Sequence, residues 1–170
     1  MGDRDHALEV IRRSFDHGRR TDLSADVLLV AELDGEVAAA LASFPVEEGR
    51  RRGAALLRVA LSRTPPWRWP PMLRFFWQAR SASPPPPPES LYVDALATGE
   101  RFRRRGAARA LLAAAEEKGR DLGLGLVSLD TEVPNAAARS LYRGAGFSEQ
   151  GETEPKHGFP GYVLYVKRIG

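Results

Sequence analysis

The residues between Leu96 and Leu112 have the types and the spacing of an anion-binding turn. A segment that favours a strand ends here, an arginine-rich turn follows, and a helical pattern begins near Gly106. The first N–H groups of a helix have no partner inside it, and they favour a phosphate together with the positive end of the helix dipole. Small side chains allow a ligand close to the backbone at Gly106, Ala107 and Ala108. Four arginines can add charge-assisted hydrogen bonds: Arg103, Arg104, Arg105 and Arg109.

Two common nucleotide-binding motifs are excluded at this turn. It contains no Gly-Lys-Ser/Thr sequence, which excludes a P-loop, and its glycine spacing does not match Gly-x-Gly-x-x-Gly. Metal chemistry is not expected either. The chain has no cysteine, and the histidines lack the spacing of metal ligands: His6, His17 and His157. The sequence therefore predicts a phosphate or pyrophosphate site without a metal.

The elements around the turn predict an α/β fold. Val27–Leu33 and Glu36–Phe44 are rich in strand-forming residues and flank Asp34-Gly35, a strong signal for a two-residue hairpin. Leu8, Ile11 and Phe15 have helical spacing within residues 7–15.

Downstream, strands and helices alternate. The strands predicted at Leu91–Ala97 and Leu126–Thr131 are joined by a helix from Gly106 to Leu122, so we expect them to be parallel neighbours. A further helix at Pro134–Arg143 and a terminal hairpin complete the pattern, the hairpin pairing Phe147–Thr153 with Tyr162–Lys167.

The segment from Gly49 to Ser90 has an unusual composition. It holds nine of the 13 prolines and all three tryptophans, including an unbroken run from Pro84 to Pro88 that predicts a stiff polyproline spacer. Met72–Ala79 is expected to form a short apolar helix. Two interpretations stay open: a functional or mobile loop, or a proline-rich surface excursion over a small satellite core.

Two motifs together resemble the GCN5-related N-acetyltransferases, the GNAT family. Arg103-x-x-Gly106-x-Ala108 is similar to the signature (Gln/Arg)-x-x-Gly-x-(Gly/Ala), and Asn135-x-x-Ala-x-x-x-Tyr142 followed by Gly-Phe is similar to a second one. The similarity covers about residues 91–151. It implies a single domain over residues 1–170, with a mixed sheet of six to seven strands flanked by helices, an acetyl-CoA-binding core at 91–151, and a Pro/Trp-rich insertion at 49–90. One departure is Arg104, which stands where the family frequently has glycine.

The resemblance also implies roles for individual residues. Backbone groups at Leu96, Ala97 and Thr98 would contact the pantetheine arm of acetyl-CoA, and residues 103–109 would hold its pyrophosphate. Asn135 would contact the cofactor near the thioester; it is also a candidate helix N-cap, and the two roles can coexist. Arg139, in the same motif, is expected on the cofactor side.

Tyr142 occupies the family's general-acid position. A phenol has a pKa near 10, so it is neutral at pH 7 and can donate a hydrogen bond or a proton to a departing thiolate. It also fits the apolar face of a short helix, which would be a packing role. For the base that takes a proton from the acceptor amine, we predict Asp94, on the strand face expected to hold Tyr92 and Leu96. Asp130 and Glu132 compete with it.

These inferences predict an enzyme that moves the acetyl group of acetyl-CoA to the amine of a small molecule or peptide by direct attack in a ternary complex. One alternative is a sensor that binds acetyl-CoA without turnover. Another is a nucleic-acid-binding module built on Arg50–Arg52 and Arg101–Arg105. A net charge of +3 over 170 residues disfavours the last, so nucleic acid is not an expected partner. We find no signal peptide and no membrane-spanning stretch, and we expect a cytoplasmic protein that could form a homodimer.

Overall fold

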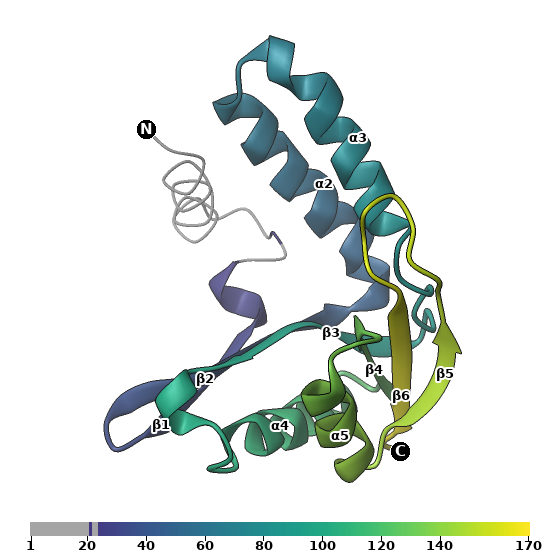
Figure 1. Cartoon of the computed structure of the whole chain (residues 1–170). Coiled ribbons are helices and arrows are strands. Elements are labelled where there is room, and N and C mark those ends of the chain that lie inside the picture. The colour runs from purple at the N-terminus through teal and green to yellow at the C-terminus, as the bar shows by residue number, and fades with distance from the viewer. Residues whose placement is uncertain (1–20, 22–23) are drawn as a thin grey trace.

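A six-stranded mixed sheet forms the centre of the domain (Figure 1). The computed structural model describes Thr21 and residues 24–170, so the helix predicted at residues 7–15 lies outside the described part. The strands follow the order β1-β2-β3-β4-β6-β5, and β3 and β4 form the parallel pair, as predicted. Their bounds are β1 Leu28–Leu33, β2 Glu36–Pro45, β3 Ser90–Thr98, β4 Leu126–Glu132, β5 Ser148–Glu152 and β6 Tyr162–Arg168.

The predicted Asp-Gly hairpin is confirmed. Asp34 and Gly35 have φ values of 56° and 76°, and two consecutive positive φ angles are what a tight turn between twisted strands requires. The terminal hairpin of β5 and β6 is also antiparallel, as predicted.

Helices α4 (Ala107–Asp121) and α5 (Ala136–Gly144) lie on one side of the sheet (Figure 1). The apolar residues of α4 face the sheet, since Leu111, Leu112 and Ala115 are buried against the strands. Leu122 instead lies beyond the helix end and is 52% exposed. Gly123 follows with a φ of 71°, a conformation that ends the helix at little cost only for glycine.

Strands β3 and β4 are paired over only part of their length. Their register runs from Ser90 opposite Leu126 to Val93 opposite Leu129 and then stops. β3 continues along β2 as far as Thr98, whereas β4 continues along β6 as far as Glu132. The two strands therefore diverge, and among the described residues no strand pairs with this edge of β3 after Val93.

A β-bulge in β3 corrects one expectation. Val93 pairs with Ser43 and Ala95 with Ala42, so Asp94 is an extra residue in the ladder. The bulge shifts the alternation of side chains by one residue. Tyr92 therefore shares the face of Phe44, while Leu96 lies opposite Leu41 on the other face. The prediction that Tyr92, Asp94 and Leu96 share a face is wrong.

The segment between β2 and β3 is mainly helical, which its proline-rich composition did not predict. Helix α2 (Val46–Arg63) and helix α3 (Trp69–Arg80) form a hairpin that projects from the sheet on the side opposite α4 and α5 (Figure 1). The predicted Met72–Ala79 helix is confirmed within α3. The prolines beside it, at 65, 66, 70 and 71, occupy helix starts or the residues just before them, where a missing N–H costs little. The proline content of the whole segment therefore obscured the helical pattern of α2, which is long and rich in alanine and leucine.

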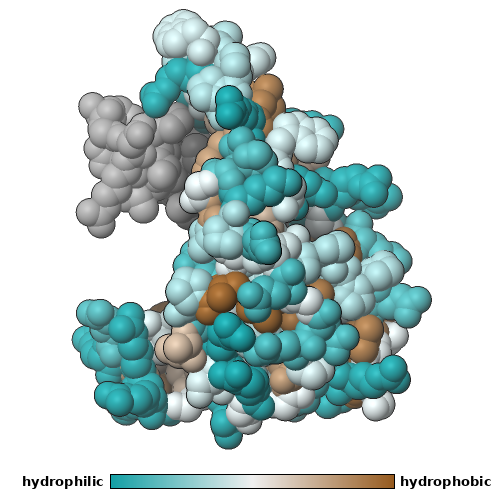
Figure 2. All heavy atoms as spheres, turned by 45° about the vertical axis from the view of Figure 1, so that its right-hand side comes forward, coloured by the Kyte–Doolittle hydropathy of each residue, from teal (hydrophilic) through white to brown (hydrophobic). Residues whose placement is uncertain are grey.

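Mostly hydrophilic residues cover the projecting upper part of the molecule in Figure 2. Among the described residues, no helix is both long and apolar enough to cross a membrane.

Candidate functional site

The turn between β3 and α4 has the backbone geometry of an anion site. Arg104 and Gly106 have φ values of 60° and 87°, and Gly106 is the N-cap of α4. The N–H of Ala110 makes the first bond of the helix, to the carbonyl of Gly106. The N–H groups of residues 107–109 thus precede the helical ladder and are available to a ligand. A Cβ built on Gly106 would meet nothing within 4 Å, so the space beside this backbone is open.

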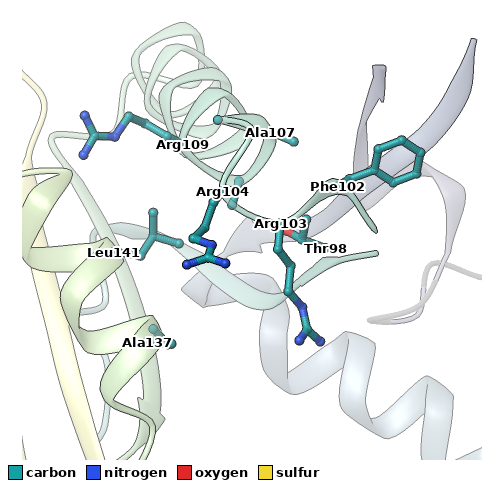
Figure 3. Close-up of a pocket in the computed structure, with 11 residues that line it drawn as sticks. Thr98, Phe102, Arg103, Arg104, Ala107, Arg109, Ala137 and Leu141 are labelled. Atoms are coloured by element: carbon teal, nitrogen blue, oxygen red, sulfur yellow. The ribbon is translucent and has the colours of Figure 1, made fainter. Parts of the chain in front are cut away.

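A cavity of about 420 Å³ lies directly in front of the turn (Figure 3). Its walls come from the end of β3, the turn, the first residues of α4 and one face of α5. Figure 3 shows Arg104 pointing from the turn toward Leu141 and Ala137 of α5, while Arg103 and Arg109 diverge to either side. The lining residues are Thr98, Phe102, Arg103, Arg104, Gly106, Ala107, Ala108, Arg109, Ala137, Ala138 and Leu141.

The arginines of the turn fall into two groups. Arg104 and Arg109 line the cavity and have no carboxylate partner within the described part of the chain, and Arg103 has only an exposed partner, Glu100, at 3.6 Å. Arg105 does not line the cavity, because its guanidinium pairs with Asp34 of the β1–β2 turn at 2.9 Å. The cavity therefore keeps three of the four predicted cations.

Of the three predicted strand contacts, one lines the cavity and two lie beside it. Thr98 lines the cavity, whereas Leu96 and Ala97 lie on the stretch of β3 that has no partner strand on its β4 side. The open strand edge and the turn are continuous, so an extended ligand could run from one to the other.

Asn135 and Arg139 serve the structure of α5. The Asn135 side chain accepts a hydrogen bond from the N–H of Ala138 at 3.2 Å, so its predicted N-cap role is confirmed. Arg139 donates to the carbonyl of Val133 and pairs with Glu149 of β5 at 3.3 Å. Neither residue lines the cavity.

Comparison with known proteins now decides the family. The sequence model of the Acetyltransferase (GNAT) family matches residues 4–147. The chain belongs to the GNAT acetyltransferases. No curated protein sequence matches this acetyltransferase.

Solved structures agree on the fold. An N-acetyltransferase from Staphylococcus aureus Mu50 is similar with a TM-score of 0.70 and 21% identity, over 98% of this chain and 82% of that one. A crystal structure described as an acetyltransferase is similar with a TM-score of 0.68 and 21% identity, over 100% and 83%. An acetyltransferase from Bacillus anthracis str. Ames, solved with acetyl coenzyme A, has a TM-score of 0.55 and 12% identity, over 83% and 61%.

In this GNAT acetyltransferase, Tyr142 is held protonated. The residue lies on α5, is 7% exposed, and packs against the rings of Phe147 and Tyr165. Burial, followed by the nearby charge of Asp130, raises the pKa of the Tyr142 phenol to about 12. Among the described residues, no hydrogen bond uses the Tyr142 hydroxyl. The group is therefore a neutral donor with its hydrogen uncommitted.

Asp130 is the carboxylate best placed opposite that donor. It follows Leu129, the last residue of β4 that pairs with β3, so it stands where the two strands begin to separate. Tyr92 donates to Asp130 Oδ2 at 2.8 Å, and Ser83 lies near this carboxylate. Burial raises the pKa of Asp130, and the interactions with Tyr92 and Ser83 oppose the shift. The charge of Asp130 also acts on Tyr142, which brings the two groups into one electrostatic site.

The predicted base has a different environment. Asp94 is exposed on the β-bulge, and Glu132 is exposed at the end of β4. From the sequence, Asp130 was only a competitor of Asp94, and the partners of Asp130, Tyr92 and Ser83, were missed. A polar residue inside the apolar run of β4 was the available signal for Asp130. Nothing in the sequence indicated Ser83, which reaches this carboxylate only because the hairpin of α2 and α3 ends beside β4.

Proposed function

We propose that this acetyltransferase moves the acetyl group of acetyl-CoA to the amine of a small molecule or peptide, by direct attack in a ternary complex. The observation that carries the proposal is the cavity at the N-terminus of α4, which joins an anion-binding turn to an open strand edge. Arg103, Arg104 and Arg109 supply three cations for a pyrophosphate, and the N–H groups that begin α4 supply donors.

The unpartnered edge of β3 would hold the pantetheine arm. A strand edge offers N–H and C=O groups at regular intervals, and pantetheine carries two amides that can pair with them. This contact would direct the thioester toward the divergence of β3 and β4, between Tyr142 and Asp130. We therefore infer that the acetyl group is transferred there.

In the proposed reaction the amine nitrogen attacks the thioester carbonyl carbon. A C–N bond forms and the C–S bond breaks, while one proton passes from the amine to the departing sulfur. We assign the first half of that proton movement to Asp130, in place of Asp94, because its raised pKa suits a base that works near neutral pH. We assign the second half to Tyr142, whose hydroxyl can donate to the developing thiolate.

Binding and turnover test separate parts of the proposal. At a concentration 100 times its Kd, acetyl-CoA should stabilise the fold by about 2.7 kcal/mol, which for a chain of this size raises Tm by about 5–10 °C. Thiol release with a panel of amines then measures transfer. Arg104→Glu should abolish the Tm shift, whereas the matched control Arg168→Glu, at an exposed arginine on β6, should keep it. A Tm shift without thiol release from any amine would favour the sensor alternative, and no shift at all would refute both.

A further inference from the structure

The helical hairpin of α2 and α3 carries a cluster of positive charge that has no part in the proposed acetyl transfer. Between residues 49 and 88 the chain has eight arginines and no lysine, and all 22 of its acidic residues lie elsewhere. Arg52 is the buried exception, since it pairs with Asp26 and Glu48. Arg58, Arg63, Arg74 and Arg80 are exposed and have no carboxylate partner within the described part of the chain. A general preference for arginine over lysine cannot explain a segment that also excludes acids.

Large aromatic side chains are exposed among these arginines. Trp67 is 77% exposed, Trp77 is 71% exposed and Phe75 is 60% exposed, and α3 has no buried residue. Tryptophan, phenylalanine, methionine and arginine are the residues enriched in protein interfaces, where lysine and acidic residues are depleted. The composition of α3, which is Trp-Pro-Pro-Met-Leu-Arg-Phe-Phe-Trp-Gln-Ala-Arg, follows that pattern.

The C-terminal end of α3 lies near the acetyl-transfer site. Arg74, Trp77 and Arg80 are spaced three residues apart and so lie on one side of α3. The helix ends at Arg80, and Ser83, three residues beyond it, lies near Asp130. The stripe from Arg74 to Arg80 is about 9 Å long, the length of about three residues of extended peptide. A second contact ties α3 to the domain, because Phe75 packs on Phe159 of the β5–β6 loop at 5.4 Å between ring centroids.

We propose that the stripe of Arg74, Trp77 and Arg80 docks an acidic segment of a peptide or protein acceptor. The inference rests on the proposed function and names its substrate class. Guanidinium groups bind carboxylates through two parallel hydrogen bonds, and Trp77 between them supplies apolar contact. A peptide that lies along the stripe toward Ser83 brings its free amine to Asp130. Charge complementarity selects an acidic chain, and the short distance in sequence from the end of α3 to Ser83, which lies near Asp130, selects the acceptor over an unrelated partner.

All three tryptophans of the chain lie on this hairpin, so their fluorescence reports on it alone. The probe is a short glutamate oligomer with a free N-terminal amine, compared with a glutamine oligomer of equal length, without acetyl-CoA. The glutamate oligomer should shift or quench the emission with an affinity that falls as salt rises, and the glutamine oligomer should not. In thiol-release assays the glutamate oligomer should have the lower KM.

Charge reversal then locates the contact. The double variant Arg74→Glu with Arg80→Glu should raise the KM for the glutamate oligomer by about tenfold or more. It should leave acetyl-CoA affinity and the KM for the glutamine oligomer unchanged. The single variants Arg74→Glu and Arg80→Glu are compared with Arg168→Glu, which changes the net charge by the same amount, and circular dichroism checks the fold of each variant.

Several results would overturn the inference. One is an equal response to both oligomers, and another is a glutamate response that survives the double reversal. A third is an emission change caused by phosphatidylglycerol vesicles or single-stranded RNA but not by the glutamate oligomer. A fourth is a response that requires removal of residues 1–20, because the stripe would then belong to that segment. Failure of thiol release with every amine would instead refute the proposed function, since the fluorescence result does not depend on turnover.

Discussion

Replacing Asp130 by asparagine tests the proposed proton transfer most directly. The two side chains have nearly the same shape, and the carbonyl oxygen of the new amide can still accept the hydrogen bond from Tyr92. Because burial raises the pKa of Asp130, the fold holds its proton more tightly than the unfolded chain does. The contribution of this group to stability is therefore greatest below its ordinary pKa and is lost as pH rises through the folded pKa. Asparagine carries no charge, so it removes the free-energy cost of burying an ionised carboxylate. The variant should therefore be as stable as the wild type at neutral pH, or more so.

The catalytic effect should depend on the acceptor. For an alkyl amine, which is mostly protonated at pH 7, loss of a positioned base should lower kcat/KM by about 10²–10⁴-fold. An aromatic amine is already neutral at pH 7 and needs no deprotonation before attack. For that acceptor we expect kcat/KM to fall by less than about tenfold, because the base does not have to remove a proton from the amine before attack.

The assay is thiol release from acetyl-CoA as a function of pH, with alkyl and aromatic amines in parallel. In the wild type the acidic limb of kcat/KM should lie above the ordinary pKa of aspartate, and it should disappear in Asp130→Asn. Tyr92→Phe removes a hydrogen bond that lowers the pKa of Asp130, so it should move the limb to higher pH. Asp94→Asn, which changes the exposed carboxylate of the bulge, is the matched control. The reasoning fails if Asp94→Asn loses the limb instead, or if Asp130→Asn slows both kinds of amine equally.

Three further outcomes follow from the structure. Tyr142→Phe should lower kcat by about 10²-fold or more with little change in acetyl-CoA affinity. Wild-type activity should persist above pH 10, because burial raises the pKa of Tyr142 to about 12. An alkaline limb near pH 10 would contradict this. Gly106→Ala should destabilise the fold by about 1–2 kcal/mol and weaken acetyl-CoA binding in calorimetry. The reason is that its φ of 87° disfavours a side chain even though the space is open. Unchanged stability and affinity would argue against a role of this turn in acetyl-CoA binding. Arg52→Ala should cost about 1.5–3 kcal/mol in chemical denaturation, because it removes the 2.8 Å ion pair with Asp26 and the 3.1 Å hydrogen bond to the Thr21 carbonyl; a cost below about 0.5 kcal/mol would refute this.

Local sequence patterns correctly predicted several single turns and helices. Asp34-Gly35 specified its turn because both residues tolerate positive φ. The helix that begins at Ala107 was predicted because a glycine start and an apolar stripe are features of neighbouring residues. The same reasoning failed at α2, where proline-rich surroundings outweighed a helical pattern in the prediction. The predicted cytoplasmic location, the absence of a nucleic-acid partner and the homodimer stay predictions.

Tertiary structure decided the partners of the charged side chains. The arginines of the turn are equivalent in the sequence, yet Arg105 pairs with Asp34, which is 71 residues away, while Arg104 faces the cavity. The choice between Asp94 and Asp130 depended on a bulge and on the point where two strands separate.

The sequence by itself determined the family, the succession of the strands and the position of the turn before α4, because each is encoded by residues within a few positions of one another. Only the tertiary structure decided which carboxylate is desolvated, which arginines remain available to a ligand, and where the hairpin of α2 and α3 lies. Those properties depend on distance in space, and packing between segments sets that distance.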